Sequence, residues 1–322
     1  MNEKYYSYQA PVRPRIRKLG TIACDIVEAT PIVFDGRLYR LEYVRAHKNN
    51  EANPSETTHL RLIDVYSRAT VSTLAEDHHF GTTFADGGYM YVAATAKPDE
   101  DTIYEDWGGV RVDIYRSSDL KQWELYSSVS FEGHHIFNTA ICKKDGKYTM
   151  LAEIDLPVLF SFRFAQSDDM KNWEVLPEKY IFQKGRYSGG PAMYTVSGDP
   201  HYYVFYLEAN PGPCYTNCIA RSRDLVEWEY SPVNPVLMFD AEEDKKIANP
   251  FLTPHEQERI ARALDINNSD MELCEFGGRT IIYYSWGCQM GIEFLAEACY
   301  EGSMKDFLQG FFERRSDRPV EV

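Results

Sequence analysis

Three short stretches decide the fold: SSDLKQWE at residues 117–124, SDDMKNWE at 167–174 and SRDLVEWE at 222–229. Their tryptophans, Trp123, Trp173 and Trp228, follow one another at intervals of 50 and 55 residues. A pattern that recurs at such a period predicts a repeat architecture. The Asp of the motif can bond the backbone of a turn while the Trp packs between neighbouring sheets, so we interpret the motif itself as structural.

A second signature recurs along the chain, a polar turn between two β-rich runs. The turns contain pairs such as Asp-Gly, Gly-Gly or Gly-Asp, which supply the positive φ of a tight hairpin. Five such hairpins lie around Gly36, Gly87, Gly146, Gly198 and Gly278. Each is followed by a third β-like run, and in the middle repeats the Ser-x-Asp motif then leads into a fourth. The sequence therefore predicts an all-β protein, a five-bladed β-propeller with four-stranded antiparallel blades.

The ends of the chain and one internal stretch depart from this rhythm. The first repeat lacks the Ser-x-Asp motif, and the fifth keeps only an echo, GSMKDFLQGFF at 302–312. Terminal repeats are often atypical because they carry ring closure. We interpret residues 1–20 as an N-terminal extension and residues 241–266 as a short helical insertion between blades 4 and 5. A single propeller domain is thus expected over residues 1–322.

Composition narrows the classes of function. Of 322 residues, 44% are hydrophobic and 14% aromatic, which suits a large folded core. Lys and Arg total 34 against 49 Asp and Glu, a net charge of -15, which disfavours nucleic acid and anionic membranes as partners. The first twenty residues contain no apolar signal-peptide core, and the seven cysteines are odd in number and scattered. We therefore expect a cytoplasmic protein with reduced thiols and no membrane span.

The alignment of the repeats also predicts a site. The innermost strands of a propeller line its axis, so residues at one repeat offset converge there. Eight residues before the turn glycine stand Glu28, His79, Asn138 and Asp270, in blades 1, 2, 3 and 5. The matching region of blade 4 is YSGGP at residues 187–191, whose small residues leave room for a ligand. We expect the four polar side chains to share one cavity.

Chemical roles follow from residue type. Two carboxylates whose environments push their pKa values apart can cleave a glycosidic bond, so Glu28 and Asp270 are the expected acid and base. His79 is expected to tune a carboxylate or to serve as the acid itself. The other residues expected at the funnel, as substrate contacts, are Asn138, His78, His135, Glu153, Glu208, Arg186, Tyr187 and Trp286, with Glu42, Asp155 and Trp107 as further candidates. An alternative is that the polar groups only satisfy one another, or bind an ion, across a narrow axis.

The hairpin units with their S-x-D-L-x-x-W-E turns resemble the five-bladed β-propeller glycoside hydrolases, the group around glycoside hydrolase family 43. The resemblance covers roughly residues 20–312. It implies a glycosidase that acts at the propeller axis. In family 43 the base is an Asp directly before a Pro in the first inner strand, whereas here Thr30 precedes Pro31 and the nearest carboxylate is Glu28. The resemblance thus implies a divergent member with a rearranged acid and base.

Together these observations predict an exo-acting glycosidase that works on short oligosaccharides without a cofactor. Cys214 and Cys218 have no second Cys or His pair nearby, so no metal site is predicted. Two other classes remain open at this stage: a carbohydrate-binding propeller without catalysis, and a sugar phosphorylase or lyase on the same fold. The sugar, its linkage, the stereochemistry and the oligomeric state are left undetermined by the sequence.

Overall fold

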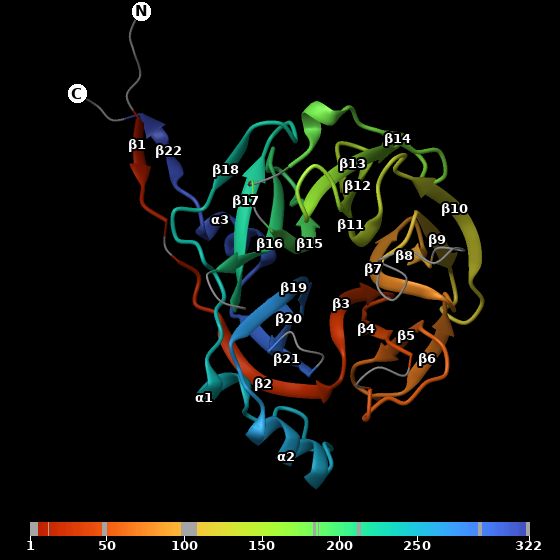
Figure 1. Ribbon diagram of the computed structural model, residues 1–322. Coiled ribbons are helices and arrows are strands. Elements are labelled where there is room, and N and C mark those ends of the chain that lie inside the picture. The colour runs from red at the N-terminus through yellow and green to blue at the C-terminus, as the bar shows by residue number, and fades with distance from the viewer. Residues whose placement is uncertain are drawn as a thin grey trace, which may run out of the picture.

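Five four-stranded antiparallel sheets surround a common axis (Figure 1). The computed structural model describes residues 6–11, 13–46, 50–97, 108–182, 185, 187–210, 214–288 and 292–319. Each innermost strand packs against the innermost strands of both neighbouring sheets, so the sheets form a closed ring. The predicted five-bladed β-propeller is confirmed.

The first three blades each consist of consecutive strands, with the innermost strand first in the chain. Blade 1 consists of β3 (Val27–Phe34), β4 (Arg37–Val44), β5 (His59–Asp64) and β6 (Thr70–Leu74). Blade 2 consists of β7 (His78–Asp86), β8 (Tyr89–Ala96), β9 (Arg111–Ser117) and β10 (Glu124–Ser130). Blade 3 consists of β11 (Ile136–Lys144), β12 (Lys147–Ile154), β13 (Ser161–Ser167) and β14 (Glu174–Val175), which a 3-10 turn at Glu178–Tyr180 follows.

Blade 4 is also consecutive, but blade 5 takes its outermost strand from the other end of the chain. Blade 4 consists of β15 (Ser188–Tyr194), β16 (Tyr202–Asn210), β17 (Cys214–Ser222) and β18 (Trp228–Tyr230). Blade 5 consists of β19 (Asn267–Phe276), β20 (Arg279–Gly287), β21 (Glu293–Tyr300) and β2 (Arg17–Cys24). The extension expected over residues 1–20 therefore overlaps a blade strand, because β2 closes the ring. Near the two chain ends, β1 (Tyr6–Gln9) pairs with β22 (Arg314–Pro319).

The helices of the insertion lie outside the ring of sheets, as Figure 1 shows. The insertion between blades 4 and 5 contains α1 (Ala241–Asp244) and α2 (Pro254–Arg262). Thr253 and Glu256 form a reciprocal capping box at the start of α2, with Pro254 in its first turn. The echo of the motif in the fifth repeat forms α3 (Met304–Gly310). Among the described residues, no helix combines the length and apolarity needed to cross a bilayer.

The repeated motif acts as the sequence indicates. In blade 3, Asp169 Oδ1 accepts hydrogen bonds from the backbone N–H groups of Lys171 and Asn172, both at 2.8 Å. Trp173 joins the apolar cluster between blades 2 and 3, and Trp228 stacks on Phe164 of the preceding blade with centroids 6.1 Å apart. Each motif thus caps its own turn and packs a tryptophan toward the preceding blade.

Candidate active site

Four polar side chains from three blades meet where the innermost strands begin. Glu28 lies on β3, Asn138 on β11, Glu153 on β12 and Asp270 on β19. The pairing of each inner strand shifts register at this level, and Glu28 and Asp270 adopt left-handed φ values of 54° and 52°. Such a bulge re-aims a side chain relative to the regular alternation of a strand. It explains why polar side chains at equal repeat offsets reach one place.

One amide connects the glutamates of two blades. The Nδ2 atom of Asn138 donates to Glu28 Oε1 and to Glu153 Oε2, each at 3.2 Å. Glu153 Oε2 also accepts from the backbone N–H of Gly190 at 3.1 Å. The other oxygen of Glu28, Oε2, is buried and has no hydrogen-bond partner. Because protein surrounds Glu28 on most sides and one oxygen is unused, this carboxyl group is suited to donate a proton to a bound molecule.

The glycines of blade 4 provide the space that these carboxylates occupy. A Cβ atom added to Gly189 would lie 3.0 Å from Glu153 Oε1, and one added to Gly190 would collide with Asp270 Oδ1. Gly190 also has a left-handed φ of 52°. The small residues at 187–191 were expected to leave room for a ligand, and in the structure the two glycines leave room for Glu153 and Asp270.

The environment separates the protonation states of the carboxyl groups. Burial and the nearby Asp270 raise the pKa of Glu28 well above its usual range. Burial raises the pKa of Glu153 to about 8 and that of Asp270 to about 6. The three carboxyl groups therefore differ in proton affinity, and Asp270 gives up its proton at a lower pH than Glu153. One group can donate a proton while another accepts one.

Arg45 supplies a positive charge that the sequence analysis did not single out. Its Nη2 atom pairs with Glu293 Oε2 at 2.9 Å, and its charge opposes the rise in the pKa of both Glu28 and Asp270. Arg45 directly follows β4, the second strand of the first hairpin. The sequence analysis treated acids near the end of the second hairpin strand as candidates. The same rule applied to Lys and Arg would have identified Arg45.

Aromatic rings flank the carboxylates on the side of blades 3 and 4. The ring centroid of Tyr187 lies 4.8 Å from that of Phe160 and 5.3 Å from that of Tyr215. Burial and the charge of Glu153 raise the pKa of Tyr187 well above its usual range, which places this ring beside the acidic groups. The role of Tyr187 as a substrate-stacking residue stays a prediction.

The three histidines lie in other hydrogen-bonded pairs. His79 Nδ1 is 2.9 Å from the hydroxyl of Tyr43, and His78 Nε2 is 3.0 Å from Asp113 Oδ2. His135 Nδ1 is 2.9 Å from Asp155 Oδ2 at the end of β12. His79 thus contacts blade 1, the blade that carries Glu28, and its role beside the carboxylates stays a prediction.

Other expected substrate contacts are placed differently. Trp286 is 1% exposed, stacks on Phe294 at 4.5 Å and donates its indole N–H to Thr21 Oγ1, so it belongs to the core of blade 5. Its predicted role as a stacking residue is corrected, because its β20 position turns the ring into the sheet interface. Glu208 is buried and accepts from the hydroxyl of Tyr206 at 3.3 Å, and Glu42 forms ion pairs within blade 1. Arg186 and Trp107 lie outside the described residues.

In the part of the chain that the structure describes, no group of three or more His, Cys, Asp or Glu side chains is arranged to hold a metal ion. Glu272, two residues beyond Asp270, was missed by the sequence analysis. It accepts from the hydroxyl of Tyr194 at 2.9 Å and from Thr30 Oγ1 at 3.4 Å. The charge of Asp270 helps to raise the pKa of Glu272, but the register shift between Ser269 and Glu272 hides this proximity from a rule of strand alternation.

The fold defines the class of protein as a five-bladed β-propeller with a carboxylate cluster at its axis. No protein-family model matches the sequence, and no curated protein matches it. Among solved structures it is similar to the catalytic domain of a GH62 α-L-arabinofuranosidase from Coprinopsis cinerea, with a TM-score of 0.58 and 10% identity over 92% of this chain and 97% of that one.

Two further solved structures belong to longer proteins. The GH43 protein BlXynB from Bacillus licheniformis gives a TM-score of 0.58 and 14% identity, covering 96% of this chain and 60% of that one. The GH32 β-fructofuranosidase BmSUC1 from Bombyx mori gives 0.57 and 10%, covering 88% and 61%. The chain thus spans about three fifths of these two proteins. At such identities the likeness shows a common fold, and the propeller that the resemblance implied is confirmed.

Proposed function

We propose that the protein is a glycoside hydrolase whose acid and base are Glu28 and Asp270. The observation that carries this proposal is the meeting of Glu28 and Asp270, from blades 1 and 5, in one cluster with Asn138 and Glu153 where the inner strands begin. The pKa of Glu28 is raised well above its usual range, whereas that of Asp270 rises only to about 6. Two titratable groups driven apart in this way suit acid and base roles. Glycoside hydrolases among the structures of similar fold support the same reading.

In the proposed reaction Glu28 donates its proton to the glycosidic oxygen as the bond from that oxygen to the anomeric carbon breaks. The bonding electrons leave with the oxygen. A water molecule attacks the anomeric carbon and gives its proton to Asp270, or Asp270 attacks first and water releases the sugar afterwards. The proton then returns to Glu28, so no reagent other than water is consumed. Asn138, which also donates to Glu153, holds Glu28 Oε1, so Oε2 is the oxygen left without a hydrogen-bond partner.

Two further parts of the proposal concern the substrate and the cellular location of the protein. We propose exo action on short oligosaccharides, because inner strands from all five blades surround the axis and Tyr187 offers a ring for a terminal sugar. A location inside the cell is supported by the cysteines, since all seven are free thiols.

The test is turnover of a panel of aryl glycosides and short oligosaccharides by the wild type and three variants. Glu28→Gln and Asp270→Asn keep the side-chain size and remove the acid or the base, so each should lower kcat by about 10² to 10⁴-fold. Glu28→Gln should retain more activity toward aryl glycosides with acidic leaving groups, which need no protonation. Glu275→Gln, an exposed position on the same strand as Asp270, is the matched control.

Three results would contradict the assignment. Full activity in both active-site variants would exclude this pair. Saccharide binding without turnover of any substrate would identify a binding propeller, and turnover that requires inorganic phosphate would identify a phosphorylase. NMR detection of the anomer released first would then separate inversion from retention.

A further inference from the structure

The insertion between blades 4 and 5 makes a buried ion pair directly ahead of Glu28. Arg259 of α2 donates from Nη1 and Nη2 to the two carboxylate oxygens of Asp25, at 2.8 and 2.6 Å. Asp25 is 1% exposed, adopts a left-handed φ of 58° and also accepts from the backbone N–H of Ala52 at 2.9 Å. A two-pronged arginine contact fixes the orientation of a carboxylate more strictly than a single bond.

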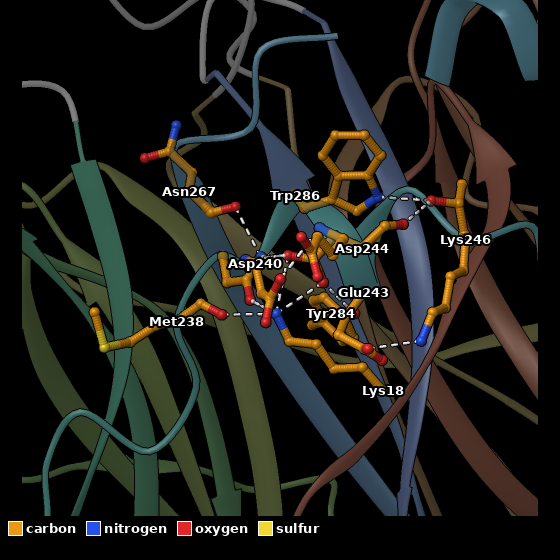
Figure 2. Close-up of polar contacts among 12 residues, drawn as sticks. Lys18, Met238, Asp240, Glu243, Asp244, Lys246, Asn267, Tyr284 and Trp286 are labelled. Atoms are coloured by element: carbon orange, nitrogen blue, oxygen red, sulfur yellow. Dashed lines mark hydrogen bonds and ion pairs between the residues drawn. The ribbon is translucent and has the colours of Figure 1, made fainter. Parts of the chain in front are cut away.

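The insertion is itself anchored at a second point, shown in Figure 2. Asp244, at the end of α1, is fully buried and lies 2.7 Å from Lys18 Nζ of β2. The hydroxyl of Tyr284 donates to the same carboxylate at 2.6 Å. Beyond α1, the backbone N–H of Thr21 donates to Lys246 O at 2.7 Å. The insertion is therefore fixed along β2, so the helix that carries Arg259 is anchored beside Asp25.

Asp25 is connected to the carboxylate cluster in two ways. Only Ile26 and Val27 separate it from Glu28, and its backbone N–H donates to the carbonyl of Glu293 at 3.0 Å. The side chain of Glu293 holds Arg45, whose charge opposes the rise in the pKa of Glu28. The turn at Asp25 thus sets where β3 begins and where Glu293 lies.

We propose that Arg259 is a positioning residue for Glu28: by clamping Asp25, the insertion fixes the bulge that carries the proton donor. This inference rests on the proposed function. Blade 1 does not place Glu28 alone, because the turn before β3 is also held by β21 through Glu293 and by α2 through Arg259. A displacement of about 1 Å at a reacting group can cost 10²-fold in rate.

The kinetic test compares Arg259→Met with Arg259→Lys and a matched control on the same helix. Arg262→Met removes an exposed arginine that pairs only within α2, with Glu258 at 2.6 Å. We expect Arg259→Met to lower kcat about 10 to 100-fold while KM changes less than about 3-fold. Arg259→Lys should restore part of kcat because it keeps one charged contact, and Arg262→Met should leave kcat unchanged.

Two readouts do not depend on activity. The thiol of Cys24 is 1% exposed and its Sγ lies 4.0 Å from the carbonyl of Glu256 in α2, so release of α2 should speed its labelling by a maleimide. The backbone N–H of Glu28 donates to Ser285 Oγ at 3.3 Å, so a shifted bulge should speed hydrogen exchange there. Mass spectrometry of peptides that contain Cys24 or Glu28 measures both.

These readouts separate the failure of the two proposals. Faster Cys24 labelling together with unchanged kcat would overturn the positioning role, since α2 would then have been released without consequence. Unchanged exchange at Glu28 in a folded Arg259→Met variant would overturn it as well. If the wild type cleaves no glycoside, the proposed function fails, and the exchange result alone decides whether Arg259 holds Glu28.

Discussion

Glu272→Gln should make the stability of the protein less dependent on pH. Glu272 lines a cavity of about 420 Å³ to which all five inner strands contribute, at residues beyond Glu28 and Asp270 in their strands. Burial raises the pKa of Glu272 to about 8, with Asp270 adding to the rise. A glutamine can accept from the hydroxyl of Tyr194 and donate its amide N–H to Thr30 Oγ1, whose own hydrogen can go to the carbonyl of Gly81.

The sign and size follow from the two pKa values. The unfolded carboxyl titrates near its ordinary value of about 4.3, so the folded state binds the proton more tightly. The stabilisation is complete below that value and is lost as the pH rises through about 8. Between pH 5.5 and 7.5 the folded group keeps a proton that the unfolded group has lost. Each pH unit in that window therefore costs about 1.4 kcal/mol, or about 3 kcal/mol in all.

Urea unfolding at pH 5.5, 6.5 and 7.5 measures this effect as a difference between two proteins. The free energy of unfolding of Glu272→Gln relative to wild type should rise by about 3 kcal/mol across the window. Contributions from other buried acids such as Glu153 are common to both proteins and cancel. Glu275→Gln, exposed on the same strand, should show a constant difference. Parallel profiles for wild type and Glu272→Gln would refute the raised pKa of Glu272.

Two further predictions concern the fit of the site and the anchor of the insertion. Gly190→Ala should lower both stability and kcat, because its Cβ would collide with Asp270 Oδ1. Gly198→Ala is the control, since Gly198 also has a positive φ but no close contact. Thermal unfolding and turnover of the two variants separate crowding from backbone strain. Equal loss in both variants would show that crowding is unimportant. Lys18→Met should cost about 3 to 5 kcal/mol in urea unfolding, because it leaves a buried carboxylate unpaired. Lys246→Met removes only an exposed pair, and an equal cost there would contradict the argument.

The blade pattern was predictable because it depends on local chemistry. Turns at Asp35-Gly36 and Asp145-Gly146 have positive φ at both residues, as a type I′ hairpin requires. The Asp of the Ser-x-Asp motif bonds the backbone of its own turn, so eight consecutive residues are enough to predict its role. By contrast, β2 joins blade 5 with residues more than 250 positions away in the chain, and no local signal assigned it there.

The site was predictable in part, for a related reason. Equal repeat offsets brought Glu28, Asn138 and Asp270 together, since inner strands converge on an axis. His79 stands at the same offset in blade 2, and its Nδ1 atom meets the hydroxyl of Tyr43 in blade 1. The repeat offset did not identify Glu153, because this residue lies on the second strand of its blade and occupies space left by the glycines of blade 4.

The sequence by itself determined the number of blades, their turns and which polar residue types enter the axis, because spacing and turn chemistry act over a few neighbouring residues. The tertiary structure decided ring closure by β2, the contact of Arg259 with Asp25 and the different pKa shifts of three carboxyl groups. Those properties depend on distances between blades and on exclusion of water. They arise only when residues far apart in the chain are packed against one another.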